Sequence, residues 1–168
     1  MHGHGAGTTS LTIPFLGCQS YDAFDPATRQ ALGVEDDGLY LYRHCLPPRV
    51  TNLAFVGSEV ATVSNVMTHA VQAEWVARVM AGTVALPSAD AMAADVAASK
   101  AWKRSWMPKT AGRANLVLLH QIHYHDSLLK DMGVPHRRKG ANVLAELFMP
   151  YQAGDYDGII RKSSSAPA

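Results

Sequence analysis

The amino-acid sequence predicts a mostly helical α+β fold, in which short strands come first and helices fill the second half of the chain. Two observations lead to this fold class. The apolar run LAFV at residues 53–56 has the length of a buried strand and is followed by Gly57. From residue 65 onward the apolar side chains instead recur every three or four positions, which is the period of an amphipathic helix. A complete doubly wound domain needs several parallel strands, so a strand pair followed by helices indicates part of a larger fold.

The size and composition indicate a soluble globular protein of one domain. At 168 residues the chain is long enough to bury a core. Its formal net charge of +1 gives no reason to expect a nucleic acid or an anionic membrane as partner. No apolar run approaches the roughly 20 residues of a membrane span, and the N-terminus lacks the features of a secretory signal. The two cysteines, Cys18 and Cys45, have no metal-binding spacing and favour the reducing cytoplasm, while a single disulfide stays open as an alternative.

The first half of the chain is expected to hold a disordered start, a short helix and two strands ahead of LAFV. Residues 1–10 are rich in Gly, His and Thr and are predicted to be disordered. Residues 11–17 (LTIPFLG) suit a short strand, which their proline confines to a sheet edge. Asp25, followed by proline, opens a helix that ends at Gly33. The alternating run LYLYRHCL at 39–46 predicts another strand, which two prolines stop.

Two helices with clear boundaries follow the LAFV strand. The first covers residues 66–80 and stops at Gly82. Its apolar face is predicted to comprise Val66, Met67, Ala70, Val71, Trp75, Val76, Val79 and Met80. The second helix begins after the N-cap Ser88 and runs to about Trp106, just before a proline.

The last third of the chain is predicted to be helical as well. One helix is expected over about 114–132, because a glycine and a proline follow it closely. A shorter helix is expected over about 139–148, ahead of another proline. Residues 159–168 (IIRKSSSAPA) are predicted to form a disordered tail.

The junction between the LAFV strand and the next helix is the first candidate site. Gly57 lacks a Cβ atom and can let a ligand approach the backbone closely. Free N–H groups at the start of the helix favour an anionic oxygen. Hydroxyl and amide side chains are available at Ser58, Thr62, Ser64, Asn65 and Thr68. By pattern alone, a turn in which Ser64 or Asn65 merely caps the helix is the simpler interpretation, since every helix needs a cap.

Histidines gather at residues 120–126 (HQIHYHD). On a helix, His120 and His123 share a face, whereas His125 points about 200° away from His123. Zinc sites on helices prefer the i, i+4 spacing of HExxH. We therefore predict no metal site and expect partly exposed helix histidines. No GxSxG motif, cysteine–histidine pair or pair of carboxylates completes an active site, so the sequence identifies no catalytic residues.

Basic and aromatic side chains are interleaved in the predicted second helix and just after it. They are Lys100, Trp102, Lys103, Arg104, Trp106, Lys109 and Arg113, with a further basic group at 136–139. Such a mixture can bind nucleic acid through phosphate contacts and stacking. Because the chain has no excess of positive charge, a solvated helix face is the favoured interpretation and no nucleic-acid partner is predicted. Asp36 and Asp37, in the turn-like VEDDG, are expected to be exposed.

Residue order adds a family resemblance. The run LYRHCLPPRVTNLAFVGSEVATVSNVMTHAVQAEWVARVMAGTVALPS resembles the C-terminal part of flavin-containing monooxygenases, particularly the plant branch. That family has LYR, a proline, an NLAFVG strand, a loop, a helix ending near a Trp, and LPS. The later run DMGVPHRRKGANVLAELFMPYQAGDYDG is similar to the family's MG…RK…EAF.PY…DY ending. The resemblance covers about residues 39–158.

The resemblance implies an FAD enzyme that uses NADPH and O2 to oxygenate a soft nucleophile, nitrogen or sulfur, in a small-molecule substrate. It implies that residues 53–56 are the last strand of an FAD-binding Rossmann-like domain. Residues 11–158 would then be the C-terminal portion of that FAD domain plus a helical extension. The family's flavin-proximal positions match Gly57, Ser58, Glu59, Ser64 and Asn65, which we take as the candidate cofactor-binding residues.

Several departures from the family pattern limit what these residues are expected to do alone. The glycine-rich segment at residues 3–8 fails GxGxxG at its last position and follows no strand, so neither family fingerprint is present. Leu16 stands where the family has a threonine, and Glu74 where it usually has a basic residue. We therefore expect a partial monooxygenase that is inactive as an isolated chain. The alternative is a non-catalytic helical module that associates through exposed apolar surface of the 53–56 strand and the 66–80 helix.

Overall fold

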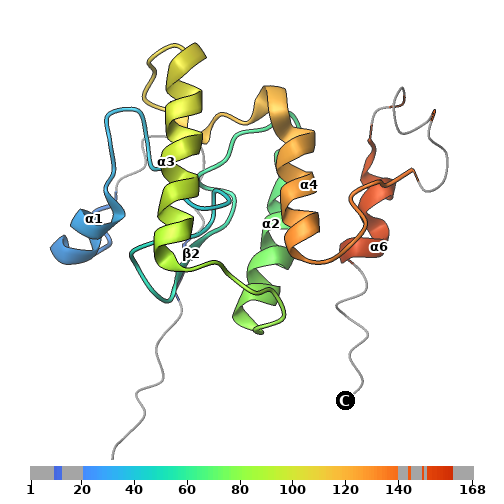
Figure 1. Ribbon diagram of the computed structural model, residues 1–168, viewed down its shortest axis with the longest axis horizontal. Helices are drawn as coiled ribbons and strands as arrows, with labels where there is room; N and C mark the ends of the chain where they lie inside the picture. The colour runs from blue at the N-terminus through green and yellow to red at the C-terminus, as the bar shows by residue number, and fades with distance from the viewer. Residues whose placement is uncertain (1–9, 13–20, 140–143, 145–148, 150, 161–168) are drawn as a thin grey trace, which may run out of the picture. The chain divides into compact units, whose positions relative to one another are not determined.

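The computed structural model describes residues 10–12, 21–139, 144, 149 and 151–160 (Figure 1). The chain divides into two compact units. The first unit comprises Met1–Ala61 and Pro87–Val117, and the second comprises Thr62–Leu86 and Leu118–Ala168. The predicted strand–loop–helix site is thus divided between Ala61 and Thr62. Among the described helices, none is long and apolar enough to cross a membrane.

The first unit contains a short parallel strand pair. β1 (Ser10–Thr12) runs beside β2 (Leu53–Phe55), with Ser10 opposite Leu53 and Thr12 opposite Phe55. All three residues of β2 are buried, as expected for a compact apolar strand. The predicted strand over 11–17 is confirmed where the structure describes it, and its remainder lies outside the described residues.

Helix α1 (Pro26–Leu32) has the boundaries that its local signals predict. The Asp25 carboxylate accepts N–H bonds from Ala27 and Thr28, both 3.0 Å, and so caps the first turn. Gly33 ends the helix in the left-handed conformation, at φ 64°. Leu32 joins the apolar core of this unit, which also contains Leu39, Leu41, Leu53 and Phe55, with Tyr21, Phe24 and Val50 packed against it.

The predicted strand at 39–46 is wrong. Tyr42 and Leu46 form one isolated antiparallel bridge, and between them the chain makes a tight turn. Arg43 and His44 both have positive φ values, 52° and 53°, which a strand does not allow. The alternation of apolar residues still has a consequence, because Leu39 and Leu41 are buried in the core.

Helix α2 (Asn65–Met80) opens the second unit and α3 (Ala89–Trp106) belongs to the first. The α3 boundary follows the prediction, since the Ser88 hydroxyl accepts the Ala91 N–H at 3.2 Å. The α2 boundaries also follow it, with Gly82 at φ 71° after the last turn. Its predicted apolar face is only partly correct, because Val66 and Met80 are 84% and 60% exposed. The buried face instead combines Val71, Trp75 and Val76 with the polar Thr68, Gln72 and Glu74.

The helix predicted over 114–132 is broken in the structure. Its first part is a 3₁₀ turn, η1 (Arg113–Asn115), followed by a parallel bridge between Leu116 and Ala61. A second 3₁₀ turn, η2 (Leu118–His120), leads into α4 (Gln121–Asp131). The bridge captures backbone groups that a continuous helix would need, which explains the break.

The second unit is built on the packing of α2 against α4, which lie side by side in Figure 1. Val71, Trp75, Leu128 and Leu129 are fully buried in it, and the Trp75 indole N–H donates to Asp131 at 3.2 Å. Two short elements close this unit, η3 (Ala153–Tyr156) and α6 (Asp157–Ile160). The predicted 139–148 helix lies largely outside the described residues. Ile159, at the start of the predicted tail, is buried in α6.

Candidate functional site

The five candidate cofactor-binding residues fall into two groups. Gly57, Ser58 and Glu59 belong to the first unit and follow β2 directly, whereas Ser64 and Asn65 begin α2 in the second unit. Gly57 has φ 78°, the left-handed conformation that favours glycine over other residues. Ser58 and Glu59 are both buried.

Glu59 is a buried carboxyl group with one unsatisfied oxygen. Its side chain is 1% exposed, and Oε1 accepts the Tyr21 hydroxyl at 3.0 Å. Among the described residues Oε2 has no hydrogen-bond partner. Burial raises the pKa of Glu59 to about 7, because the carboxylate loses its hydration, although the Tyr21 hydroxyl favours the charged form. The group therefore carries a proton through much of the range near neutral pH.

The backbone around Glu59 is also held. The His44 Nδ1 atom lies 2.9 Å from the Glu59 carbonyl oxygen, which it contacts from the positive-φ turn at 43–44. The carboxyl group and its backbone are thus supported by two side chains, Tyr21 and His44, that lie 38 and 15 residues away in the chain. A sequence pattern that extends over a few residues has no signal for either contact.

Neither Ser64 nor Asn65 caps α2 with its side chain. Ser64 makes no side-chain cap, and the Asn65 Oδ1 atom accepts the Thr62 N–H at 2.8 Å instead. Gln121, at the start of α4, caps this end in part, since its Oε1 accepts the N–H of Ser64, the N-cap residue, at 3.3 Å and that of Val63, just before it, at 3.0 Å. The simple capping interpretation is therefore correct for the position of Ser64 and wrong for its side chain, which makes no cap bond.

The Gln121 contact leaves most of the N–H groups at the α2 start unaffected. The backbone donors that can meet an anionic or carbonyl oxygen at a helix start are those of the N-cap and the first three helical residues, here Ser64 to Met67. Gln121 accepts only the Ser64 N–H among them. The sequence has no glycine fingerprint of the kind that binds the pyrophosphate of a dinucleotide.

A buried chain of hydrogen bonds runs from the α2 start through the interior of the second unit. The Thr68 hydroxyl donates to the Ser64 carbonyl at 3.0 Å and lies 2.9 Å from His125 Nε2. His125 Nδ1 is 2.7 Å from the Tyr156 hydroxyl. The Thr68 hydroxyl also lies 2.7 Å from the Thr62 hydroxyl. The buried imidazole is thus held through both of its nitrogens, each of which faces a hydroxyl group. These hydrogen bonds hold the Tyr156 hydroxyl in the interior of the second unit.

His125 is therefore not the partly exposed histidine that the sequence predicts. Its side chain projects from α4, is fully buried, and contacts Thr68 of α2 and Tyr156 of η3. Burial, with a smaller effect of the nearby Arg138 charge, lowers the pKa of His125 to about 4, while Asp126 opposes the shift. The imidazole is consequently neutral at physiological pH. The described residues contain no cluster of three or more His, Cys, Asp or Glu side chains that could hold a metal ion.

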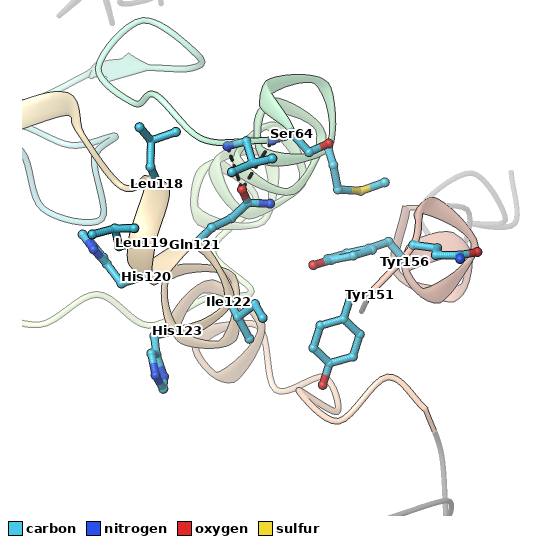
Figure 2. A pocket seen from close by; sticks show the side chains of 12 residues that line it. Ser64, Leu118, Leu119, His120, Gln121, Ile122, His123, Tyr151 and Tyr156 are labelled. Atoms are coloured by element: carbon cyan, nitrogen blue, oxygen red, sulfur yellow. Dashed lines mark hydrogen bonds between the residues drawn. The ribbon is translucent and has the colours of Figure 1, made fainter. Parts of the chain in front are cut away.

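A pocket of about 440 Å³ lies in the second unit, beside the capped start of α2 (Figure 2). Apolar and aromatic side chains make up most of its lining, and the polar groups are amides, a hydroxyl and imidazoles. The lining residues are Val63, Ser64, Met67, Leu118, Leu119, His120, Gln121, Ile122, His123, Tyr151, Gln152 and Tyr156.

Arg138 packs against two tyrosine rings, Tyr151 and Tyr156, that line this pocket. Its side chain is 1% exposed, and Nη1 is paired with the Asp126 carboxylate at 2.9 Å. The guanidinium lies over the Tyr151 ring, 3.8 Å from its centroid, and 4.8 Å from that of Tyr156. Both tyrosine rings are thereby held in place.

The charged residues of the first unit form an ion-pair network. Asp37 is 1% exposed, which contradicts the predicted exposed turn, whereas the neighbouring Asp36 side chain is 90% exposed. Arg104 bonds both Asp37 oxygens, at 3.0 and 2.6 Å, and Arg113 bonds Oδ2 at 2.8 and 2.6 Å. Arg104 and the other donors hold the pKa of Asp37 well below its usual range. The basic side chains at 104 and 113 are thus neutralised internally.

The remainder of the basic and aromatic group has a mixed environment. Lys100 pairs with Glu35 at 2.7 Å, and Lys103 is buried, donating to the Ala114 carbonyl. The predicted solvated helix face is therefore correct only in part. Trp102 and Trp106 are 49% and 44% exposed and pack against each other with ring centroids 5.2 Å apart.

Comparison with known proteins identifies the family. The family described as flavin-binding monooxygenase-like matches residues 19–138 of this chain. The chain belongs to the flavin-binding monooxygenase-like family. The resemblance to flavin-containing monooxygenases predicted from residue order is confirmed, and with it membership of a family of flavin-dependent oxidoreductases.

Individual relatives match parts of this monooxygenase-like chain. The FAD-dependent monooxygenase rstn6 of Aspergillus nomiae is 28% identical over 132 residues, covering 74% of this chain and 22% of the relative. Flavin-containing monooxygenase FMO GS-OX3 of Arabidopsis thaliana is 44% identical over 66 residues, covering 39% of this chain and 13% of the relative. The solved S-allyl-L-cysteine S-oxygenase of Allium sativum matches with a TM-score of 0.52 and 26% identity, over 64% of this chain and 24% of that one. This chain therefore spans less than a quarter of the length of each of these proteins.

Proposed function

We propose that this chain is the C-terminal part of an FAD- and NADPH-dependent monooxygenase that uses O2 to oxygenate nitrogen or sulfur in a small molecule. The family match over residues 19–138 carries this proposal. The name of the solved S-oxygenase supports sulfur as the oxidised atom. On this proposal β2 is the last strand of an FAD-binding Rossmann-like domain, and bound FAD supplies the redox chemistry that no side chain provides.

Two groups of residues, one in each unit, are the proposed flavin contacts, and each is considered by itself. In the first unit Gly57, Ser58 and Glu59 follow the carboxyl end of β2, the end at which open α/β sheets bind their ligands. The unsatisfied Glu59 Oε2 can, when protonated, donate to a cofactor acceptor. In the second unit the proposed contacts are Ser64 and Asn65, where Gln121 already accepts the Ser64 N–H.

The isolated 168 residues are proposed to be inactive. They hold no GxGxxG loop for the pyrophosphate, and Gln121 already accepts the Ser64 N–H at the start of α2. The test is to express the 168-residue chain and measure bound-flavin absorbance and NADPH consumption. We expect neither. Stoichiometric FAD in the purified chain would contradict this part of the proposal.

A chimera tests the positive part of the proposal. The matched 24% of the Allium sativum S-oxygenase is replaced by this chain. The expected chimera binds FAD, oxidises NADPH and forms a sulfoxide from a thioether. Within it, Glu59→Leu is expected to lower flavin content or rate, while Asp36→Asn, on an exposed side chain, is the control. A chimera that binds FAD but oxidises neither NADPH nor a thioether would count against the proposed activity.

The second candidate function is a non-catalytic module that associates through apolar surface. The surfaces predicted for it are covered only in part, since β2 is buried and Trp75 of α2 is 0% exposed, whereas Val66 of the same helix is 84% exposed. Two apolar side chains outside those surfaces are also exposed, Val63 at 82% and Leu119 at 84%. Size-exclusion chromatography of the chain tests this candidate, and a monodisperse monomer at high concentration would speak against it.

A further inference from the structure

The pocket beside the start of α2 has the features of a small-molecule site in its own right. We propose that it binds an uncharged aromatic molecule that carries a hydrogen-bond acceptor, such as an aryl amide or aryl ketone. The pocket lies entirely in the second unit, so the inference is independent of FAD and of the proposed oxygenation.

Size and surface support a small organic ligand. The volume of about 440 Å³ lies in the range of roughly 300–1,000 Å³ that is usual for ligand pockets. Ile122 and Leu119 are 50% and 84% exposed, so apolar surface at this site faces solvent until it is covered. Burying that surface under a ligand stabilises a complex by about 25 cal/mol per Å² of apolar area.

The charges point to an uncharged ligand. Among the described residues that line the pocket there is no Asp, Glu, Lys or Arg. A carboxylate or ammonium group would therefore lose hydration without gaining an opposite charge, which costs several kcal/mol. Arg138, whose side chain is buried, lies against the two tyrosine rings and pairs through Nη1 with Asp126 at 2.9 Å, while its Nε and Nη2 have no hydrogen-bond partner among the described residues. It does not line the pocket.

The rings of Tyr151 and Tyr156 favour an aromatic ligand. Tyr151 is held by the Arg138 guanidinium at 3.8 Å, and Tyr156 by both Arg138 and the hydrogen bond to His125. Figure 2 shows both rings on the same side of the pocket, facing Ile122 of α4. Rings that are already ordered lose little entropy when a second ring stacks on them, and each aromatic pair adds about 0.5–1.5 kcal/mol beyond area burial.

Gln121 supplies the polar contact. Its side-chain oxygen accepts two backbone N–H groups, and this fixes the orientation of the amide. The Nε2 group is then the donor that remains for a ligand. Among the described residues Nε2 has no acceptor, and Figure 2 shows it pointing away from the α2 start, toward the side on which Tyr156 lies. A carbonyl or sulfoxide oxygen on the ligand would accept a hydrogen bond from this Nε2 group.

The experiment titrates the full 168-residue chain with three naphthalene probes, without FAD or NADPH, and follows binding by probe fluorescence and calorimetry. 2-Naphthamide carries the acceptor, 2-methylnaphthalene lacks it, and 2-naphthoate carries a negative charge. We expect saturable one-site binding of 2-naphthamide, about tenfold tighter than either of the others, a difference of about 1.4 kcal/mol that one good hydrogen bond can supply.

Two variants and a control locate the site. Gln121→Glu keeps the acceptor that caps α2 but loses the Nε2 donor, and should weaken 2-naphthamide about tenfold. Ile122→Trp fills the pocket from an exposed wall without touching the cap, and should abolish binding. Met80→Ala, which truncates an equally exposed apolar side chain at the far end of α2, should leave binding unchanged.

Three outcomes would overturn the proposal. They are no saturable binding of 2-naphthamide, equal affinity for the three probes, and unchanged affinity in both Gln121→Glu and Ile122→Trp. Far-ultraviolet circular dichroism of each variant checks that the helices are retained, and Ile122→Trp decides the matter if Gln121→Glu loses them. Because no flavin is present, these results bear on the pocket alone and leave the oxygenase proposal to its own test.

Discussion

The Tyr21 hydroxyl donates a 3.0 Å hydrogen bond to Oε1 of Glu59, a carboxyl group that is 1% exposed and has a second oxygen without a partner among the described residues. Burial raises the pKa of Glu59 to about 7, so the group is about half protonated at neutral pH, although the Tyr21 bond favours the charged form. The group lies two residues after Gly57 and directly after Ser58, within the segment proposed to approach the flavin. Its protonation should be visible in the stability of the chain.

Glu59 should make the chain less stable as pH rises. Its pKa is raised from 4.5 to about 7 in the folded chain, so the unfolded chain ionises first. The stabilisation from the folded-state proton is complete below about pH 4.5 and is lost as pH rises through about 7. The full difference is on the order of 3 kcal/mol. Urea unfolding of wild type and Glu59→Gln at about pH 5 and about pH 8 measures it, and equal pH dependence in the two proteins would refute the raised pKa.

His125 should have the opposite effect in the second unit. Its pKa is lowered from 6.5 to about 4, so the folded chain keeps the imidazole neutral while the unfolded chain takes up a proton. Stability from this group is present above about pH 6.5 and falls as pH drops toward about 4. His125→Gln should flatten that decline. His123→Gln, on an exposed neighbour of the same helix, is the control and should retain it.

Removing the Gln121 cap should destabilise α2. Gln121→Ala leaves the Val63 and Ser64 N–H groups without their acceptor, and an intramolecular hydrogen bond of this kind contributes about 1 kcal/mol. Gln121→Glu should retain the stability, because a carboxylate accepts the same two bonds and suits the positive end of the helix. Thermal unfolding followed by circular dichroism measures the difference. If the alanine variant melts at the wild-type temperature, the contact does not cap α2 in solution.

Removing the Asp37 charge should lower the free energy of unfolding, and the neighbouring Asp36 provides a matched control. Asp37→Asn weakens the pairing of two arginines with a buried acceptor, an effect of about 3–5 kcal/mol when a buried pair is broken. Asp36→Asn changes the same charge on a side chain that is 90% exposed and should alter stability by less than about 0.5 kcal/mol. Urea unfolding of both variants compares them. Similar losses would show that overall charge, rather than the network, is responsible.

Local residue order was sufficient for several features of this protein. Asp25 and Gly33 mark α1, Ser88 marks the start of α3, and Gly82 follows α2, because caps and left-handed glycines act within a few residues. The same order identified the flavin-containing monooxygenase family, since the family pattern is carried by contiguous motifs. The LAFV run likewise predicted a buried strand.

Contacts between distant segments decided the rest. Gln121 reaches the start of α2 from 57 residues away, Arg113 reaches Asp37 across 76, and a bridge between Ala61 and Leu116 interrupts the helix predicted over 114–132. Nothing near Asp37 in the chain distinguishes it from the exposed Asp36. The sequence by itself determined the family and the locally capped helices. Only the tertiary structure decided which polar groups are buried, because burial and pairing depend on side chains that the chain brings together from far apart.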